Sequence, residues 1–240
     1  MENKSYAEIV GNAAAPYENA QAAKCGLATA YHGVAHPSLP NYIAMTSGST
    51  QGITDDNPPS AHPLAAPSLF SQLGSHWSSL QESMPSNCDQ ASSGEYAVKH
   101  DPAAYFTDLR SACLRQDIPL GSQPDLASTF TFVTPNLCND MHDCSVSTGD
   151  GWLSTFLPKV LDSVQYRAGN TAVFVTFDED DGSAANHVPM LVLAPSVPAG
   201  TRSAGSFDHY SLLRTTEEML GLKRLGAAAG APSMRSAFHL

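Results

Sequence analysis

Three short apolar runs along the chain predict buried β-strands. They cover residues 130–134 (FTFVT), 171–177 (TAVFVTF) and 188–194 (VPMLVLA). Alternation between apolar and polar positions is weak in all three runs, which is the pattern of parallel strands that are covered on both faces. We therefore expect a mostly parallel central sheet.

A helical pattern separates the first two runs. Its apolar positions lie near helical spacing at Trp152, Phe156, Leu157, Val160, Leu161 and Val164. Pro158 is expected to kink this helix or to mark a restart. A strand, a helix and a second strand form a right-handed crossover unit, which predicts an α/β fold with helices flanking the sheet.

Weaker patterns complete the predicted secondary structure. Further helices are expected at residues 40–47, 66–73, 103–114 and 210–220, the last with Gly221 as its C-cap. Residues 49–66 and 83–94 are typical of loops, and the tail after Leu222 is expected to be loosely ordered. The 240 residues predict one domain over 1–240, in which residues 75–125 could form a cap.

Charge excludes some classes of function. Twelve basic and 23 acidic side chains give a net charge of −11, which argues against binding of nucleic acid through phosphate contacts. No apolar run approaches the roughly 20 residues that span a bilayer, so we expect no stable membrane insertion. A small anion held with a metal ion stays compatible with this charge, because local charge can override the global balance. The pattern does not indicate an oligomeric state.

The five cysteines are Cys25, Cys88, Cys113, Cys138 and Cys144. Without a CxxC pair, a zinc site is the weaker interpretation. Two loop-closing disulfides and one spare thiol are favoured, and they indicate an exported protein, secreted or periplasmic. The first residues, MENKSYAEIVG, lack the features of a signal peptide. We expect either a mature or truncated chain, or cysteines that are reduced and buried.

Four acids follow the second apolar run, Asp178, Glu179, Asp180 and Asp181. In open parallel sheets, ligands bind beyond the carboxyl ends of the strands. A bound cation would relieve the repulsion among these acids, and hard cations prefer carboxylate oxygens. An isolated acidic turn would be the simpler interpretation, but the position at a strand end favours a metal site.

A polar loop that two cysteines bracket follows the first run, PNLCNDMHDC at residues 135–144. Turn formation accounts for Asn136 and Asn139 but not for His142 between two acids. His142 is therefore a candidate ligand or general acid, because its unperturbed pKa is about 6.5.

Ser38 lies in a third polar segment, HPSLPNYIAMTSG at residues 36–48. Pro37 and Pro40 fix the backbone around it, and an apolar helix is expected to follow. A serine at the start of a helix suits a nucleophile that attacks an anion, although it could equally be an N-cap. The chain has no GxSxG, GxxxxGK[ST] or GxGxxG motif.

Together these segments resemble the bacterial phosphoesterase family, which holds secreted acid phosphatases and phospholipases C and belongs to the alkaline-phosphatase-like superfamily. The likeness is greatest to the small acid phosphatases. It extends over nearly the whole chain, through ENKSY at 2–6, CGLATAYHGVAHPSLPNYIAMTSG at 25–48, WSSLQESMPSNC at 77–88, YAVKHDP at 96–102, PNLCNDMHDC at 135–144, TFDEDDG at 176–182 and FDHYSLLRTTEEMLGL at 207–222.

The resemblance implies a role for each matching residue. Ser38 matches the nucleophile, and His100 and His142 match histidines at the phosphate site. The matching metal ligands are Glu2, Asn3, Asp178 and Glu179, with Asn3 also a phosphate contact. His187 and His209 lie in matching segments, where a structural role is equally expected. A second metal ion on His142, His187 or His209 with Asp140 is a further option in this superfamily.

Two departures from the family pattern lie at Met1 and Cys25. Family members carry an apolar strand immediately before the Glu-Asn pair, whereas Met1 stands directly before Glu2. We therefore expect a sheet that lacks its first strand. Cys25 is similar to a family cysteine whose usual partner near residues 55–56 is missing here, which implies that Cys25 is the spare thiol.

The resulting hypothesis is a metal-dependent acid phosphatase that cleaves phosphate monoesters through a phosphoserine on Ser38. One divalent metal ion is expected, Ca²⁺, Mg²⁺, Mn²⁺ or Zn²⁺, and the partner is a small phosphorylated substrate. A protonated histidine that serves the leaving alcohol favours an acidic optimum. The alternatives are a phosphodiesterase or phospholipase C with the same site, and a non-catalytic, calcium-binding secreted module.

Overall fold

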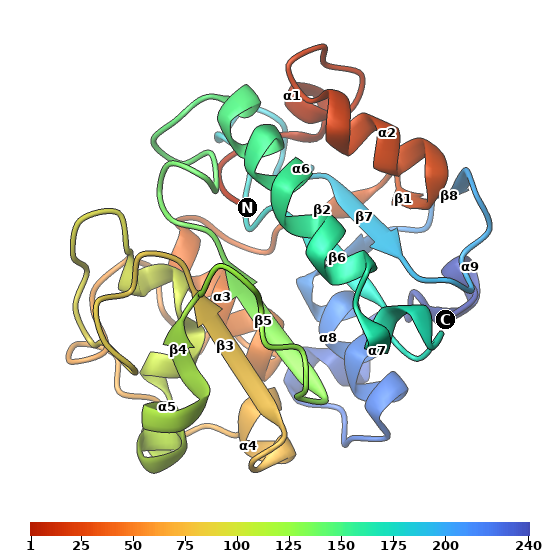
Figure 1. Cartoon of the computed structure of the whole chain (residues 1–240). Helices are drawn as coiled ribbons and strands as arrows, with labels where there is room; N and C mark the ends of the chain where they lie inside the picture. The colour runs from red at the N-terminus through yellow and green to blue at the C-terminus, as the bar shows by residue number, and fades with distance from the viewer.

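The strands form two main sheets and one short ribbon (Figure 1). The computed structural model describes residues 1–240. The four-stranded sheet has the order β6-β7-β1-β8, the three-stranded sheet has the order β4-β3-β5, and β2 pairs with β9. The strands are β1 (Gly26–Ala28), β2 (Tyr31–His32), β3 (Trp77–Gln81), β4 (Asp117–Pro119), β5 (Phe130–Thr134), β6 (Val173–Thr176), β7 (Met190–Leu193), β8 (Thr201–Ser203) and β9 (Phe207–Asp208).

Most strand pairs are parallel, as expected for an α/β fold, but one expected detail is wrong. The pairs β1–β8, β2–β9, β3–β4 and β3–β5 are parallel. In contrast, β7 is antiparallel to both of its neighbours, β1 and β6, and β6 and β7 carry the second and third apolar runs. The connection between them at residues 177–189 contains no helix. The chain therefore turns back beside β6 instead of crossing over to a parallel neighbour.

The first and second apolar runs lie in different sheets. β5 pairs only with β3, and β6 pairs only with β7, so each has one edge without a strand partner. The two strands of the expected crossover unit, β5 and β6, therefore do not belong to the same sheet. Beside β6, the Met1 amine donates to Thr176 O (3.1 Å), and Asp178 N donates to Met1 O (3.1 Å). The expectation that the sheet lacks a strand before Glu2 stays a prediction.

The helices follow the predicted pattern with shifted ends. They are α1 (Tyr6–Ile9), α2 (Pro16–Lys24), α3 (Ser38–Ser47), α4 (Leu69–Leu73), α5 (Arg110–Gln116), α6 (Val146–Leu161), α7 (Val164–Arg167), α8 (His209–Leu220) and α9 (Arg235–Phe238). Helix α6 runs through Pro158, and α8 ends before Gly221, whose φ is +67°. None of these helices is both long and apolar enough to cross a membrane. Short 3-10 turns occupy the first half of the helix expected at 103–114, at η2 (Pro102–Tyr105) and η3 (Thr107–Leu109), and α5 occupies its second half.

The expectation of a loosely ordered tail is wrong. After Leu222 the chain forms the 3-10 turn η4 (Gly226–Ala229) and helix α9, and it buries the side chains of Met234 and Phe238 completely. The tail also packs against Gly48, where a Cβ would lie 2.2 Å from Leu225 O. A few apolar anchors therefore order a segment whose Ala- and Gly-rich composition favours a loop.

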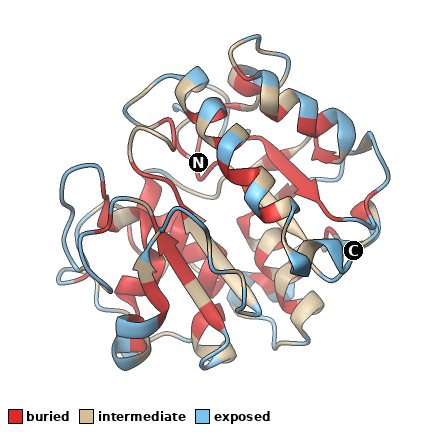
Figure 2. Cartoon of the chain, in the orientation of Figure 1, coloured by how far each residue is buried: buried red, intermediate tan, exposed pale blue.

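Two large hydrophobic clusters form the cores around the two sheets. One includes Val192, Phe207 and Phe238 around the four-stranded sheet, and the other includes Trp77 and Phe106 around the three-stranded sheet. Figure 2 shows the buried positions concentrated on the strands and on the inner faces of the helices. β3 and β4 lie within residues 75–125 but share a sheet with β5. A cap over these residues stays a prediction.

The two disulfides join the cysteines that bracket loops. Cys88 is bonded to Cys113 and Cys138 to Cys144, while Cys25 is free. The second disulfide closes a loop of six residues next to the polar segment that follows β5. The expected pattern of two disulfides and one spare thiol is confirmed.

Two buried carboxyl groups, those of Asp150 and Glu18, lie between α2 and α6. Asp150 on α6 accepts the backbone N–H groups of Tyr17 (3.0 Å) and Glu18 (2.8 Å) in the first turn of α2. The Glu18 side chain is 2% exposed, and neither of its carboxylate oxygens has a hydrogen-bond partner. Burial, together with the charge of Asp150, raises the pKa of Glu18 from 4.5 to about 8.

Replacing Glu18 by Gln is expected to reduce the loss of stability at alkaline pH. Because the folded-state pKa lies above the unfolded value, the folded chain holds the extra proton, and Glu18 lowers stability as pH rises from 4.5 to 8. The slope is at most about 1.4 kcal/mol per pH unit. Melting temperatures at pH 5 and pH 8 should differ less for Glu18→Gln than for wild type.

The exposed acid Asp108 supplies the matched control. Asp108→Asn should keep the wild-type difference between the two melting temperatures. If Glu18→Gln keeps it as well, Glu18 is ionised in the folded protein and the raised pKa is wrong.

Candidate active site

Ser38 is the first residue of α3, and its side chain is buried. Asn41, one turn further along, holds the loop that leads to it. The Asn41 Oδ1 accepts Val34 N (2.9 Å) and Ala35 N (3.0 Å), and its Nδ2 donates to Ala35 O (2.8 Å) and Pro37 O (3.2 Å). A fully hydrogen-bonded amide therefore fixes the approach to Ser38, in addition to the prolines.

The Ser38 hydroxyl lies between two buried carboxylates. Its Oγ is 3.1 Å from Glu2 Oε2 and 3.1 Å from Glu179 Oε1. Glu2 is held there by its backbone N–H, which donates to Asp140 O (2.7 Å). The fold thus brings the N-terminal segment, the start of α3 and the end of β6 to one point, although they are far apart in sequence.

The four consecutive acids have different surroundings. Asp178 and Glu179 are buried; Glu179 contacts Ser38, and Asp178 accepts the backbone N–H of Asn3. Asp180 is also buried, but it accepts three backbone N–H groups of the loop at residues 182–186. Asp181 is exposed. Asp180 therefore stabilises the loop, Asp181 borders it, and of the pair expected from the resemblance Glu179 contacts Ser38 directly while Asp178 is bonded to Asn3.

The expected ligands suit a divalent cation. Asn3 Oδ1 and Asp178 Oδ2 are buried oxygens without a hydrogen-bond partner, and Asn3 N donates to the other Asp178 oxygen (3.4 Å). Burial, followed by the charges of Glu2 and Glu179, raises the pKa of Asp178 well above its usual value. Unpartnered oxygens and crowded carboxylates are the donor set that hard cations such as Mg²⁺, Mn²⁺ and Ca²⁺ prefer.

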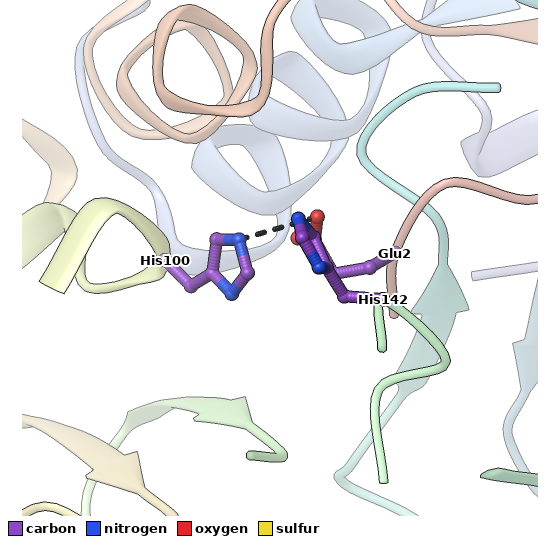
Figure 3. Close-up of side chains that lie close together, drawn as sticks. All are labelled: Glu2, His100 and His142. Carbon is purple, nitrogen blue, oxygen red and sulfur yellow. Dashed lines mark ion pairs between the residues drawn. The ribbon is translucent and has the colours of Figure 1, made fainter. Parts of the chain in front are cut away.

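His100 contributes a buried positive charge to the same place (Figure 3). It belongs to the 3-10 turn η1 (Val98–His100). Its Nε2 is 3.2 Å from Glu2 Oε2, and its Nδ1 is 3.3 Å from Asp140 Oδ2. Burial alone would lower the pKa of His100, but the charges of Glu2 and Asp140 outweigh it and raise the pKa to about 9. The imidazolium thereby offsets part of the carboxylate charge.

His142 lies beside His100 and Glu2 (Figure 3). Its Nδ1 is 2.6 Å from Asp143 Oδ1, and its Nε2 is 3.2 Å from Lys99 Nζ. An ammonium group can only donate, so Nε2 is the acceptor and the proton of this imidazole is assigned to Nδ1. Glu2, His100 and His142 also present ligand atoms within 4.8 Å of one another. These three residues could hold a nitrogen-preferring ion such as Zn²⁺.

Sequence reasoning missed several neighbours of these residues. The Tyr42 hydroxyl donates to Glu2, and its ring stacks on His100 with 5.3 Å between centroids. Tyr42 follows Ser38 by four residues, so helical spacing places both on one face of α3. The His36 Nδ1 contacts Glu179 directly. The position of His36 two residues before Ser38 was the feature of the sequence that could have indicated this contact.

His187 and His209 take part in structural hydrogen bonds. The buried His209 is 2.9 Å from the Tyr31 hydroxyl through Nδ1 and 2.5 Å from Asp178 O through Nε2. Both of its nitrogens are therefore used, and it fixes the backbone that carries Asp178. His187 stacks on Tyr6, and its Nε2 is 3.0 Å from Thr29 O.

Solved structures of known proteins share this fold. A protein in the alkaline phosphatase superfamily from Vibrio parahaemolyticus superposes with a TM-score of 0.61, at 12% identity over 99% of this chain and 70% of that one. A protein in complex with D-glucosamine-2-N,6-O-disulfate gives 0.59, at 11% identity over 99% and 78%. The chain has the alkaline-phosphatase-like fold.

Sequence relatives are more informative about the family. A phosphatidylinositol-3-phosphatase of Mycobacterium tuberculosis (strain ATCC 25618 / H37Rv) is 35% identical, over 96% of this chain and 78% of its own length. A phosphate-repressible acid phosphatase of Penicillium chrysogenum is 30% identical, over 83% of this chain and 53% of its own length. The chain thus spans about half of that fungal relative.

The profile of the Phosphoesterase family matches residues 3–223. This match contains Asn3, Ser38, His100, His142 and the Asp178–Glu179 pair, and Glu2 directly precedes it. Because the match extends over nearly the whole chain and the M. tuberculosis relative is aligned over almost all of it, the chain belongs to the Phosphoesterase family.

Proposed function

We propose that this protein is a metal-dependent acid phosphatase that hydrolyses phosphate monoesters through a phosphoserine on Ser38. The observation that carries the proposal is the position of the Ser38 hydroxyl, 3.1 Å from two buried carboxylates at the start of a helix. The relatives named acid phosphatase and phosphatidylinositol-3-phosphatase support the same reaction class. A small phosphorylated compound is the proposed substrate.

In the first step, the Ser38 oxygen forms a bond to phosphorus, and the bond between phosphorus and the ester oxygen breaks. The hydroxyl proton passes to Glu2 or Glu179, whose oxygens accept from Ser38. The leaving alkoxide takes up a proton from solvent water and departs as an alcohol. Water then attacks the phosphoserine, which releases inorganic phosphate and restores Ser38.

Glu2, Asn3, Asp178 and Glu179 would hold the divalent ion. When bound, such an ion would lower the pKa of the Ser38 hydroxyl and offset phosphate charge. His100 stabilises charge on the phosphate oxygens and orients Glu2, which it contacts at 3.2 Å. His142 and the Asn3 amide lie at the same place and are proposed to contact the phosphate.

The two disulfides support a location outside the cytosol. Disulfides persist in oxidising compartments and are rare where glutathione keeps thiols reduced. Cys138–Cys144 closes the loop that carries His142, so an oxidising compartment also keeps this part of the site in place. We propose that the protein acts in the periplasm, at the cell surface or as a secreted enzyme.

Ser38→Ala is expected to lower turnover of para-nitrophenyl phosphate by about a thousandfold or more, because the nucleophile is lost. The assay covers pH 4 to 9, with and without EDTA, and includes bis-para-nitrophenyl phosphate. Wild type should prefer the monoester and acidic pH, and should lose activity in EDTA.

Ser47 at the other end of α3 is the matched control, because it is a buried serine of the same helix that bonds only Ile43, Ser49 and Gln51. Ser47→Ala should keep activity. Full activity of Ser38→Ala would refute the phosphoserine mechanism, and a preference for the diester would favour a phosphodiesterase. Metal-dependent stabilisation without turnover of either ester would favour the calcium-binding module.

Asp178→Asn is expected to abolish turnover and to weaken stabilisation by divalent ions. A ligand present at 100 times its dissociation constant stabilises a folded protein by about 2.7 kcal/mol, so loss of a metal ligand should reduce the rise in melting temperature that Mg²⁺, Mn²⁺, Ca²⁺ or Zn²⁺ gives. Asp181→Asn, a change in the exposed acid of the same run, should retain both properties. If Asp178→Asn keeps the metal-induced rise, Asp178 is not a ligand.

A further inference from the structure

Lys99 places an ammonium group beside the proposed phosphate site. It precedes His100 on η1, and its side chain is 19% exposed. Its Nζ is 3.0 Å from Asp56 Oδ2 and 3.2 Å from His142 Nε2. The group is therefore held at the edge of the site by two side chains from other parts of the chain.

Asp56 connects this ammonium group to the helix that carries Ser38. While one Asp56 oxygen binds Lys99, the other accepts the backbone N–H of Leu39 (2.9 Å). Leu39 directly follows Ser38 in the first turn of α3. One carboxylate thus fixes the position of Lys99 relative to Ser38, and it occupies a backbone N–H that would otherwise be free for an anion.

Lys99 retains binding capacity after these contacts. An ammonium group has three N–H donors, and Asp56 and His142 use two of them. An ordinary lysine has a pKa of about 10.4, so its ammonium charge is present at neutral and acidic pH, and one donor is left for a ligand.

The charge balance of the site calls for such a group. Glu2 and Glu179 contact Ser38, Asp140 and Asp178 are also buried, and a phosphate that approaches these carboxylates is repelled unless cations offset their charge. His100 already lies between Glu2 and Asp140. Lys99 is paired with Asp56, which is 28% exposed, and lies nearer to solvent than the buried His100.

We propose that Lys99 binds a non-bridging phosphate oxygen and selects dianionic monoesters over monoanionic diesters. This inference rests on the proposed phosphatase function and attributes the preference for monoesters to Lys99. A monoester carries close to two negative charges above its second pKa of about 6, whereas a diester carries one. A fixed cation therefore stabilises the bound monoester more than the bound diester.

The test compares Lys99→Met and Lys99→Arg with wild type at pH 7, on para-nitrophenyl phosphate and bis-para-nitrophenyl phosphate. Lys99→Met should lower kcat/KM for the monoester about 10- to 100-fold and for the diester by less than about threefold. Lys99→Arg should recover most of the monoester preference because it keeps the charge. Lys159→Met is the control, since the Lys159 ammonium binds Ser122 O on the surface of α6 and should leave both rates unchanged.

A second readout separates this inference from the proposed function. Inorganic phosphate is titrated against each variant, and its dissociation constant is obtained from the shift of the melting temperature. Lys99→Met should weaken phosphate binding about tenfold, whereas Lys99→Arg and Lys159→Met should not.

Equal losses of kcat/KM for both esters, or unchanged phosphate affinity in Lys99→Met, would overturn the role of Lys99 and leave it a structural partner of Asp56. Absence of turnover of either ester in wild type would overturn the proposed function instead. In that case the phosphate titration still decides whether Lys99 binds the anion.

Discussion

The burial of several carboxylates around one hydroxyl is the constraint on which the rest of the site depends. Glu2 and Glu179 each lie 3.1 Å from Ser38 Oγ, and Asp178 is buried beside them. Like charges at such positions repel strongly in a medium of low polarity, so they persist only with compensating cations or protons. The charge of His100, the raised pKa of Asp178 and the unpartnered oxygens are three consequences of the same crowding. A divalent cation would offset the carboxylate charge and give the unpartnered oxygens a partner.

The remainder of the fold keeps these groups in place by saturating the hydrogen bonds behind them. Both nitrogens of His209 form hydrogen bonds, one with Tyr31 and one with the Asp178 carbonyl. The side-chain amide of Asn41 is fully hydrogen-bonded to the loop before Ser38. Buried polar groups that are fully bonded adopt one arrangement, because each alternative leaves a donor or acceptor without a partner. The residues behind the site thus restrict the positions that Ser38 and Asp178 can take.

The net charge of the chain and the local charge at the site affect different ligands. A chain with a net charge of −11 repels long polyanions. Within the site, His100 on η1 contacts the carboxylates of Glu2 and Asp140. A small anion responds to this short-range arrangement rather than to the total, so a strongly acidic protein can still act on phosphate.

The sequence by itself determined the elements and the chemistry at their ends. Apolar runs predicted β5, β6 and β7, and the acids after β6 and the serine at the start of α3 indicated the candidate site, because burial and strand ends leave local signals. Which acids face Ser38, the separation of β5 from β6 and the contact between Lys99 and His142, 43 residues apart, were decided only by tertiary structure. The order of the tail was decided in the same way, through the burial of Phe238. Such features depend on which distant segments meet, and local composition carries no information about that.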